Sequence, residues 1–187
     1  MNSSTILYIH GFGSDANSST AKEISKGLGA NHKVMTHSFN NSYELVDTMI
    51  ENIEVARKLI KDNNIDLVVG TSMGAFIAIN CHDITKVINN PCMLPSEQLK
   101  LRAVPEITDT ELEKYKELES SLIISPFDKD NTYGLFGMND ELFSYIDLFK
   151  KKYNPKNIYT MDDRHQISNE NIHNKLVPLI IEAIRKL

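Results

Sequence analysis

Short apolar runs alternate with longer amphipathic stretches along almost the whole chain. This alternation is typical of parallel β-strands connected by helices that cover both faces of a sheet. The apolar runs predict six strands, at residues 6–10, 33–37, 65–70, 86–89, 133–137 and 157–161. We therefore expect an α/β fold with a mainly parallel sheet.

The longest predicted helix lies between the second and third strands. Apolar residues recur at helical spacing across positions 45–60, and charged residues occupy the opposite face. Asn41 and Glu44 are spaced as a capping box at its start, and Asn63 and Asn64 would close its end. Shorter helices are expected at residues 21–28, directly after Ser72, at 141–151 and at 178–186.

Residues 91–130 fit the alternation least well. Prolines surround one charged helical run at 108–120, which Thr108 and Glu111 are spaced to cap. This stretch looks like an insertion within the domain. Two interpretations stay open: a small lid over a pocket, or a plain crossover helix.

Composition narrows the class of protein. The chain has 187 residues, of which 41% are hydrophobic and 24% charged, as expected for a single globular domain over residues 1–187. The formal net charge is -5, and the basic residues are scattered rather than grouped. Both features argue against a nucleic-acid or anionic-membrane surface.

The N-terminal residues, the length of the apolar runs and the number of cysteines bear on where the protein is found. The first residues lack the basic and apolar regions of a signal peptide, and no run approaches the ~20 apolar residues of a membrane span. Cys81 and Cys92 are the only cysteines, and we expect both to be free thiols. We therefore expect a cytoplasmic enzyme or binding domain, with a small molecule rather than a nucleic acid or a membrane as its partner, and the oligomeric state stays open.

The strongest motif is Gly70-Thr71-Ser72-Met73-Gly74, which follows an apolar strand and precedes a helix rich in small residues. A serine at such a sharp turn adopts a strained backbone conformation, and the glycines allow it because they have no side chains to collide with it. The serine hydroxyl would project above the sheet edge, and the N–H of Met73 would face a developing oxyanion. The motif predicts a nucleophilic Ser72; an ordinary N-capping serine is the alternative.

A nucleophilic serine needs a base, and the base needs an acid that orients it. With a motif of this kind, the order along the chain is serine, acid, histidine. His165 follows the last predicted strand and is our candidate base. His82 would lie about 15 Å from Ser72, along the helix that starts there, and is therefore a poor candidate for the base. His173 is the reserve candidate.

Asp140 is the predicted acid, because it closely follows the fifth predicted strand. An aspartate there could instead serve only as the N-cap of the next helix. Glu141 is expected to point into the first helical turn, and Asp128 and Asp130 precede the strand, so these three are weaker candidates.

A second turn, His10-Gly11-Phe12-Gly13, ends the first strand at the same sheet edge. With the alanine three residues later it matches the glycine-rich fingerprint of dinucleotide-binding proteins, but the second strand lacks the following acidic residue that would hold a ribose. We interpret the turn as half of an oxyanion hole, with the N–H of Phe12 beside that of Met73. His10 is expected to brace the loop by hydrogen bonds.

Metal chemistry is disfavoured. Asp162, Asp163, His165 and His173 match no compact zinc spacing, so we expect no metal and no cofactor. Apolar residues near strand ends commonly belong to the core, but four of them are candidates to line an acyl pocket. These are Phe12, Met73, Met93 and Leu94.

With these motifs, the chain resembles the α/β-hydrolase superfamily over nearly its whole length, and more narrowly the small YqiA-type esterases. The resemblance implies a triad of Ser72, Asp140 and His165 and hydrolysis of short acyl esters or thioesters. It rests on residues 7–12, the motif at 70–74, Asn90-Pro91, residues 139–141 and the late loop histidine.

Two departures from that family are visible. Such enzymes commonly have glycines before the catalytic histidine and an aromatic residue after it, whereas Asp163-Arg164 and Gln166-Ile167 flank His165 here. The loop is therefore expected to be stiffer or differently placed. Residues 91–130 offer no feature to align, which leaves the acyl and alcohol pockets undefined.

We therefore expect one α/β-hydrolase domain with strand order 2-1-3-4-5-6 and its site at the carboxyl edge of the strands. In this hypothesis the protein is a serine esterase that cleaves short-chain acyl esters or thioesters through an acyl-enzyme. An acyltransferase with the same three residues, or a catalytically silent hydrolase-fold binding protein, are the alternatives.

Overall fold

Six parallel strands form one sheet in the order β2-β1-β3-β4-β5-β6, as the sequence predicted. The computed structural model describes residues 3–101 and 107–187. Each strand begins and ends within two residues of its predicted bounds. The strands are β1 (Ser4–Ile9), β2 (His32–Thr36), β3 (Leu67–Thr71), β4 (Thr85–Asn89), β5 (Thr132–Gly137) and β6 (Ile158–Met161).

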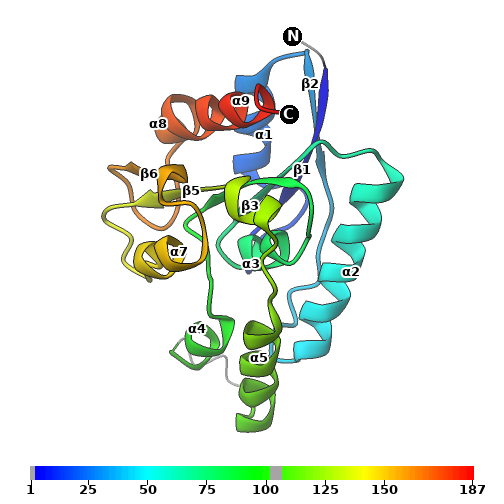
Figure 1. The fold of residues 1–187 in the computed structure, drawn as a ribbon, viewed down its shortest axis with the longest axis vertical. Coiled ribbons are helices and arrows are strands. Elements are labelled where there is room, and N and C mark those ends of the chain that lie inside the picture. Colours follow the sequence, from blue (N-terminus) through cyan, green and yellow to red (C-terminus); the bar gives the residue numbers. More distant parts are fainter. Residues whose placement is uncertain (1–2, 102–106) are drawn as a thin grey trace.

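Helices cover both faces of this sheet (Figure 1). One face is packed by α1 (Ser19–Leu28), η2 (Ile172–Leu176, a π-helical turn) and α9 (Val177–Ile184), with α8 (Asn169–Asn171) leading into them. The other is packed by α2 (Val46–Asp62), α3 (Met73–Ile79) and α7 (Ile146–Lys152). The short 3-10 helix η1 (Pro155–Asn157) leads into β6.

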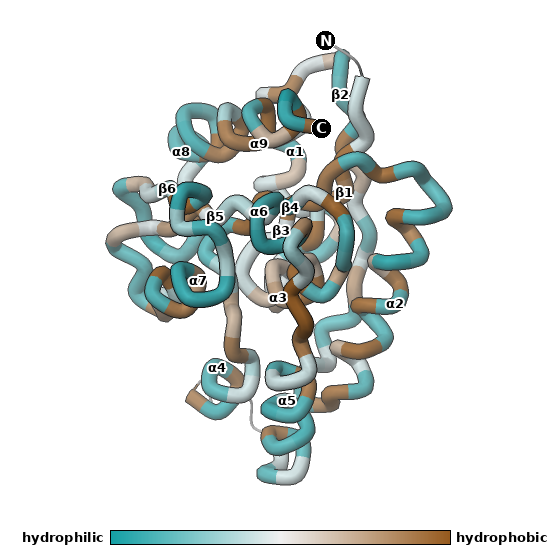
Figure 2. Tube along the Cα trace, viewed as in Figure 1, coloured by the Kyte–Doolittle hydropathy of each residue, from teal (hydrophilic) through white to brown (hydrophobic). Residues whose placement is uncertain are grey.

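The strands divide the core into two hydrophobic layers because successive side chains point to opposite faces. In β1, Ile6 and Tyr8 pack toward α1 and α9, whereas Leu7 and Ile9 pack toward α2 and α3. Figure 2 shows hydrophobic residues toward the interior and hydrophilic residues around the periphery. Within the described ranges, no helix is both long and apolar enough to cross a bilayer.

The predicted capping box at the start of α2 is wrong. Leu45 is the N-cap, and no side chain caps that helix locally. The side chain of Asn41 instead hydrogen-bonds to the backbone of the turn at residues 13–14. The N–H of Val46 donates to Glu111 Oε2 (2.9 Å), which lies 65 residues further along the chain. The predicted end is confirmed, since α2 ends at Asp62 and the next two residues are asparagines.

The helix predicted at 141–151 begins later than expected. Asp140 Oδ1 accepts hydrogen bonds from the N–H groups of Leu142 (2.8 Å) and Phe143 (3.1 Å). This local turn competes with helix formation, and α7 starts only after Tyr145. Asp140 is therefore not the N-cap of α7.

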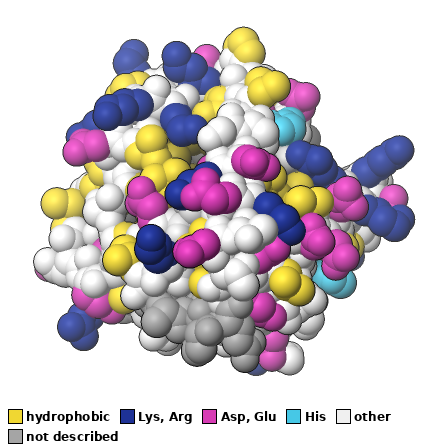
Figure 3. Space-filling view, turned by 90° about the horizontal axis from the view of Figure 1, so that it is seen from below, with side chains coloured by type: hydrophobic (Ala, Val, Ile, Leu, Met, Phe, Trp, Pro, Cys, Tyr) yellow, Lys and Arg dark blue, Asp and Glu magenta, His cyan; other side chains and the backbone are white. Residues whose placement is uncertain are grey.

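The predicted insertion at 91–130 contains α4 (Pro95–Leu101), α5 (Asp109–Ser121) and α6 (Pro126–Asp130). Residues 102–106 of it lie outside the described residues. The hydroxyl of Thr108 caps α5 by accepting the N–H of Glu111 (3.2 Å), as predicted. In Figure 1, α4 and α5 lie at the lower end of the molecule. Figure 3 shows that end from below, with charged side chains of both signs interspersed. The lid interpretation stays a prediction.

Candidate active site

Four strand ends meet at the carboxyl edge of the sheet and bring the predicted site residues together. Ser72 follows β3, Asp140 follows β5 and His165 follows β6, while Phe12 lies in the turn after β1. His165 Nε2 lies 2.9 Å from Ser72 Oγ, and His165 Nδ1 lies 2.8 Å from Asp140 Oδ2. Serine, histidine and aspartate thus form one continuous hydrogen-bonded chain.

Ser72 has the strained backbone that its motif predicts. Its φ is 53° and its ψ is -120°, a conformation that non-glycine residues rarely adopt. A Cβ on Gly70 would lie 2.7 Å from the Cα of Ala75. A Cβ on Gly74 would overlap carbonyl oxygens at the end of β1. The two glycines therefore allow α3 to pack directly against the sheet and hold Ser72 at its edge.

His165 is held with one nitrogen toward each partner. A carboxylate can only accept a hydrogen bond, so Nδ1 carries the proton that is donated to Asp140. Nε2 is then an acceptor for the hydroxyl of Ser72. The side chain is 14% exposed, and the ring of Phe143 packs against it edge-on with centroids 4.7 Å apart. This arrangement suits a general base.

Asp140 is buried but remains ionised. Burial alone would raise the pKa of Asp140. Hydrogen bonds from His165 and from the N–H groups of Leu142 and Phe143 outweigh that effect and hold the pKa below its ordinary value. A charged Asp140 can stabilise an imidazolium at His165 during a reaction.

The turn after β1 lies directly beside Ser72. A Cβ on Gly11 would lie 3.2 Å from the Cβ of Ser72. The turn closes through the N–H of Ser14, which donates to Gly11 O (3.3 Å), and Gly13 has a φ of 75°. That positive φ at the third position is the one a type II turn requires.

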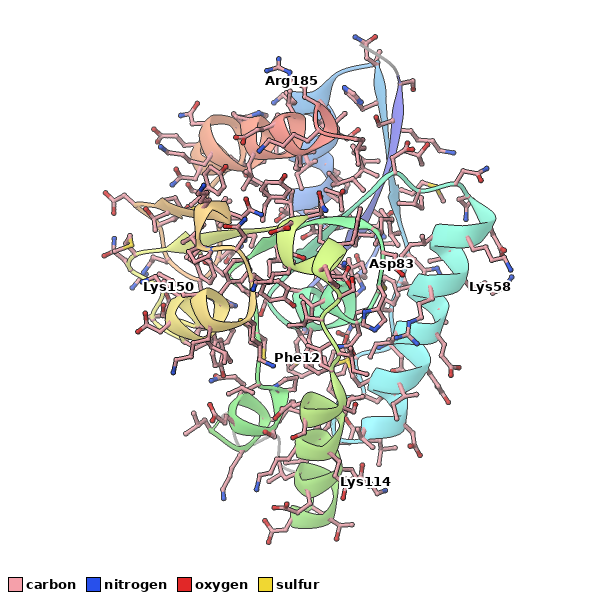
Figure 4. All side chains as sticks on the ribbon, in the orientation of Figure 1. Phe12, Lys58, Asp83, Lys114, Lys150 and Arg185 are labelled. Carbon is pink, nitrogen blue, oxygen red and sulfur yellow. The ribbon has the colours of Figure 1, made fainter. Side chains whose placement is uncertain are left out.

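The residues that carry the two predicted oxyanion donors, Phe12 and Met73, line the same cavity as Ser72. Met73 is the first residue of α3, so its N–H has no partner within the helix. In residues 3–101 and 107–187, no protein group accepts a hydrogen bond from the N–H of Phe12 or of Met73. Phe12 is labelled in Figure 4, and its ring packs on Tyr43 with centroids 5.7 Å apart. Both N–H groups are therefore available to a ligand.

His10 makes the bracing contacts expected of it. It is buried, its Nε2 accepts from the N–H of Phe39 (3.1 Å), and its Nδ1 lies 2.9 Å from Gly11 O. The imidazole thereby fixes the turn that carries Phe12.

The weaker candidates lie elsewhere, with one exception. His82 pairs with Asp128 (3.3 Å) and His173 with Glu23 (2.7 Å). Glu141 does not point into a helical turn, because none forms there. Its Oε2 accepts the backbone N–H of His165 (3.1 Å), a contact that the sequence did not reveal.

Two cavities adjoin Ser72 and His165. The first has a volume of about 150 Å³ and is mostly apolar. Its remaining lining residues are Phe12, Met73, Cys92, Gln98, Leu99, Leu142 and Phe143. The second, of about 350 Å³, has a mixed lining that is more polar than that of the first, and we call it the polar cavity; it extends along the turn after β1 to the start of α1 at residues 18–20.

Two predicted pocket residues belong to the core instead. Met93 and Leu94 pack in the hydrophobic layer of α2 and α3, and neither is among the described residues that line these two cavities. Leu142 and Phe143, which closely follow Asp140, take that place. Their nearness to Asp140 in the sequence was the available signal.

Solved structures similar to this chain are hydrolases. Est1E from Butyrivibrio proteoclasticus is 16% identical with a TM-score of 0.68, over 98% of this chain and 89% of that one. Alpha/beta hydrolase domain-containing protein 10 from mouse is 15% identical with a TM-score of 0.67, over 97% and 90%. A monoacylglycerol lipase from Paleococcus ferrophilus is 12% identical with a TM-score of 0.67, over 98% and 97%. At these identities the likeness establishes the fold.

No curated protein sequence matches the chain. The model of the uncharacterised protein family UPF0227 matches residues 5–180. The chain therefore belongs to family UPF0227.

Proposed function

We propose that the protein is a serine hydrolase that cleaves short-chain carboxylic esters or thioesters through an acyl-enzyme on Ser72. The observation that carries the proposal is the hydrogen-bonded chain from Ser72 Oγ through His165 to Asp140. Acyl transfer by a serine requires a base within hydrogen-bond distance and a third group that orients the base. The distances of 2.9 Å from Ser72 Oγ to His165 Nε2 and 2.8 Å from His165 Nδ1 to Asp140 Oδ2 fit both requirements.

The reaction then proceeds in two halves. Ser72 Oγ attacks the acyl carbonyl while its proton passes to His165 Nε2, and the N–H groups of Phe12 and Met73 stabilise the oxyanion. One such donor contributes about 3 kcal/mol. His165 next donates its proton to the leaving alcohol or thiol. It then takes a proton from the water that attacks the acyl-enzyme. The bond between the acyl carbon and Ser72 Oγ breaks, the carboxylic acid leaves, and His165 returns the proton to Ser72 Oγ.

The two cavities support a division of the substrate. An apolar cavity of about 150 Å³ favours a short acyl group by hydrophobic transfer, and an engineered cavity of about that volume holds benzene. The polar cavity suits the alcohol or thiol that leaves, because a polar leaving group keeps hydrogen-bonding partners there. The structurally similar protein from Paleococcus ferrophilus is by name a monoacylglycerol lipase, an enzyme that acts on an ester.

An acyltransferase would use the same three residues. The polar cavity reaches His165, so an alcohol or thiol bound there can replace water as the acceptor. Product analysis with water and competing alcohols separates the two activities. The assembled hydrogen bonds favour either enzyme over a silent binding protein.

A fluorophosphonate probe tests the proposal. We expect covalent labelling at Ser72, located by mass spectrometry, and no labelling of Ser72→Ala. The variant should keep its thermal midpoint, because within the part of the chain that the structure describes the Ser72 hydroxyl hydrogen-bonds only to His165. Absence of labelling in the wild type between about pH 6 and 9 would contradict a reactive serine. Esters and thioesters of graded acyl length then define the substrate.

A further inference from the structure

The side chain of Asn90 connects two loops of the candidate active site. The acid loop follows β5 and carries Asp140, and the base loop follows β6 and carries His165. Asn90 directly follows β4 and is 3% exposed. Its φ is 41°, a left-handed conformation that asparagine adopts more readily than most residues. A buried amide requires hydrogen-bond partners, and the described partners of this one lie at the end of β5 and in the loop after β6.

The partners belong to the ends of β5 and β6. Asn90 Oδ1 accepts from the N–H of Gly137 (2.7 Å), three residues before Asp140. Asn90 Nδ2 donates to the carbonyl oxygens of Arg164 (3.0 Å) and His165 (2.8 Å). One planar amide therefore links the loop that carries the acid to the loop that carries the base.

The backbone of His165 is held on both sides. Asn90 binds its carbonyl oxygen, and Glu141 accepts its N–H (3.1 Å). The two loops are also in close contact, because a Cβ on Gly137 would lie 2.7 Å from Asp163 O and 2.8 Å from Arg164 O. These contacts explain how a base loop without glycines is held in place.

We propose that Asn90 is a positioning residue that holds the acid and base loops in the register that brings His165 Nε2 to Ser72. This inference rests on the proposed function, since it assigns Asn90 a part in the same reaction. A displacement of about 1 Å in such an arrangement can lower a rate by about 10²-fold.

The test replaces Asn90 with glycine, which tolerates a positive φ and removes only the side chain. We expect kcat for a p-nitrophenyl ester to fall about 10- to 100-fold, with KM within about threefold of wild type. Fluorophosphonate labelling should slow by the same factor. Asn90→Asp, which keeps an acceptor for Gly137 but turns a carboxylate toward two carbonyls, should show the same loss and serves if the glycine variant does not fold.

Asn157 provides a matched control. It is also buried, and its amide donates to the backbone carbonyls of Asp130 (2.8 Å) and Thr132 (3.3 Å) at the opposite edge of the sheet. Asn157→Ala should lower the thermal midpoint and leave kcat of the folded enzyme unchanged. A purely structural role for Asn90 predicts the same behaviour in both variants, and that result would overturn the proposal.

A spectroscopic measurement keeps this inference separate from the proposed function. The Nδ1 proton of His165, shared with Asp140, should give a downfield proton resonance that shifts or disappears in Asn90→Gly and persists in Asn157→Ala. An unchanged resonance in Asn90→Gly would contradict positioning by Asn90. Failure of the wild type to cleave or label would instead contradict the proposed function, and the resonance would still decide the role of Asn90.

Discussion

Asp140 makes two kinds of contact that depend on different oxygen atoms. Oδ2 faces His165, and Oδ1 accepts from the N–H groups of Leu142 and Phe143. The carboxylate thus holds the imidazole of His165 and also shapes its own loop. Its side chain is 3% exposed, so both effects operate out of contact with bulk water.

Asp140→Asn should lower kcat by about 10⁴-fold. The new amide can donate to His165 Nδ1 and so favour the tautomer whose Nε2 carries the proton and cannot accept one from Ser72. Ester hydrolysis measures the effect. Asp130→Asn is the control. The side chain of Asp130 contacts Asn154 near the start of β5, whereas Asp140 follows the end of that strand, so this variant should leave kcat unchanged. A loss below about tenfold in Asp140→Asn would contradict the assigned role.

The same carboxylate makes stability depend on pH. The pKa of Asp140 is lower in the folded protein than its ordinary value of about 3.9, so its contribution to stability is fully present above that pH. The contribution is lost as pH falls through the folded pKa. Urea unfolding at several pH values should show that the wild type loses more free energy of unfolding below about pH 4 than Asp140→Asn does. Parallel curves for the two proteins would refute this linkage.

Among the elements, α2 and α5 depend on each other through Glu111. The backbone N–H of Glu111 donates to the hydroxyl of Thr108 at the start of α5. Its carboxylate accepts the N–H of Val46 at the start of α2. The spacing of Thr108 and Glu111 revealed the first contact. No spacing could reveal the second, because the cap of α2 comes from a segment that only the folded chain brings near.

Glu111→Ala should lower the free energy of unfolding by about 1 kcal/mol, because the first N–H of α2 loses its acceptor. Glu111→Gln should lower the free energy of unfolding by less, since the amide oxygen of the glutamine can still accept the N–H of Val46. Urea denaturation measures both. Equal losses would show that charge rather than the hydrogen bond is responsible.

The strand pattern and the meeting of Ser72, Asp140 and His165 could be predicted from the sequence for a shared reason. Each strand is an apolar run, and each of these three residues directly or closely follows such a run, so order along the chain maps onto one sheet edge. The parts that were not accessible depend on side chains that cross between loops. Asn90 and Glu141 hydrogen-bond to the backbone of His165. Every residue has these backbone atoms, so the identity of the residue at position 165 does not reveal such contacts.

At the scale of the whole molecule, a buried ion pair ties α6 to the sheet. Lys86 in β4 has no exposed side-chain surface, and its ammonium donates to Asp128 in α6 and to Ile84 O (2.9 Å). Asp128 also accepts from Ser125 and from the N–H of Asp83. Removal of one partner leaves an uncompensated buried charge.

Asp128→Asn should therefore lower the free energy of unfolding by about 3–5 kcal/mol. Lys58→Met, which breaks the exposed pair with Asp62, should change it by less than about 1 kcal/mol. Chemical denaturation of both variants provides the comparison. A similar small change in each would mean that Lys86 finds another partner or loses its proton in the folded variant.

The meeting of two unlike cavities at one serine implies an order of events. If the released alcohol occupies the polar side, it must depart before water can reach the acyl-enzyme by the same path. Added alcohols would then compete with water for the acyl group, so the yield of transferred ester against free acid would rise with alcohol concentration while acylation stayed constant. The shape of the site would thus set the fate of the acyl group as well as the choice of substrate.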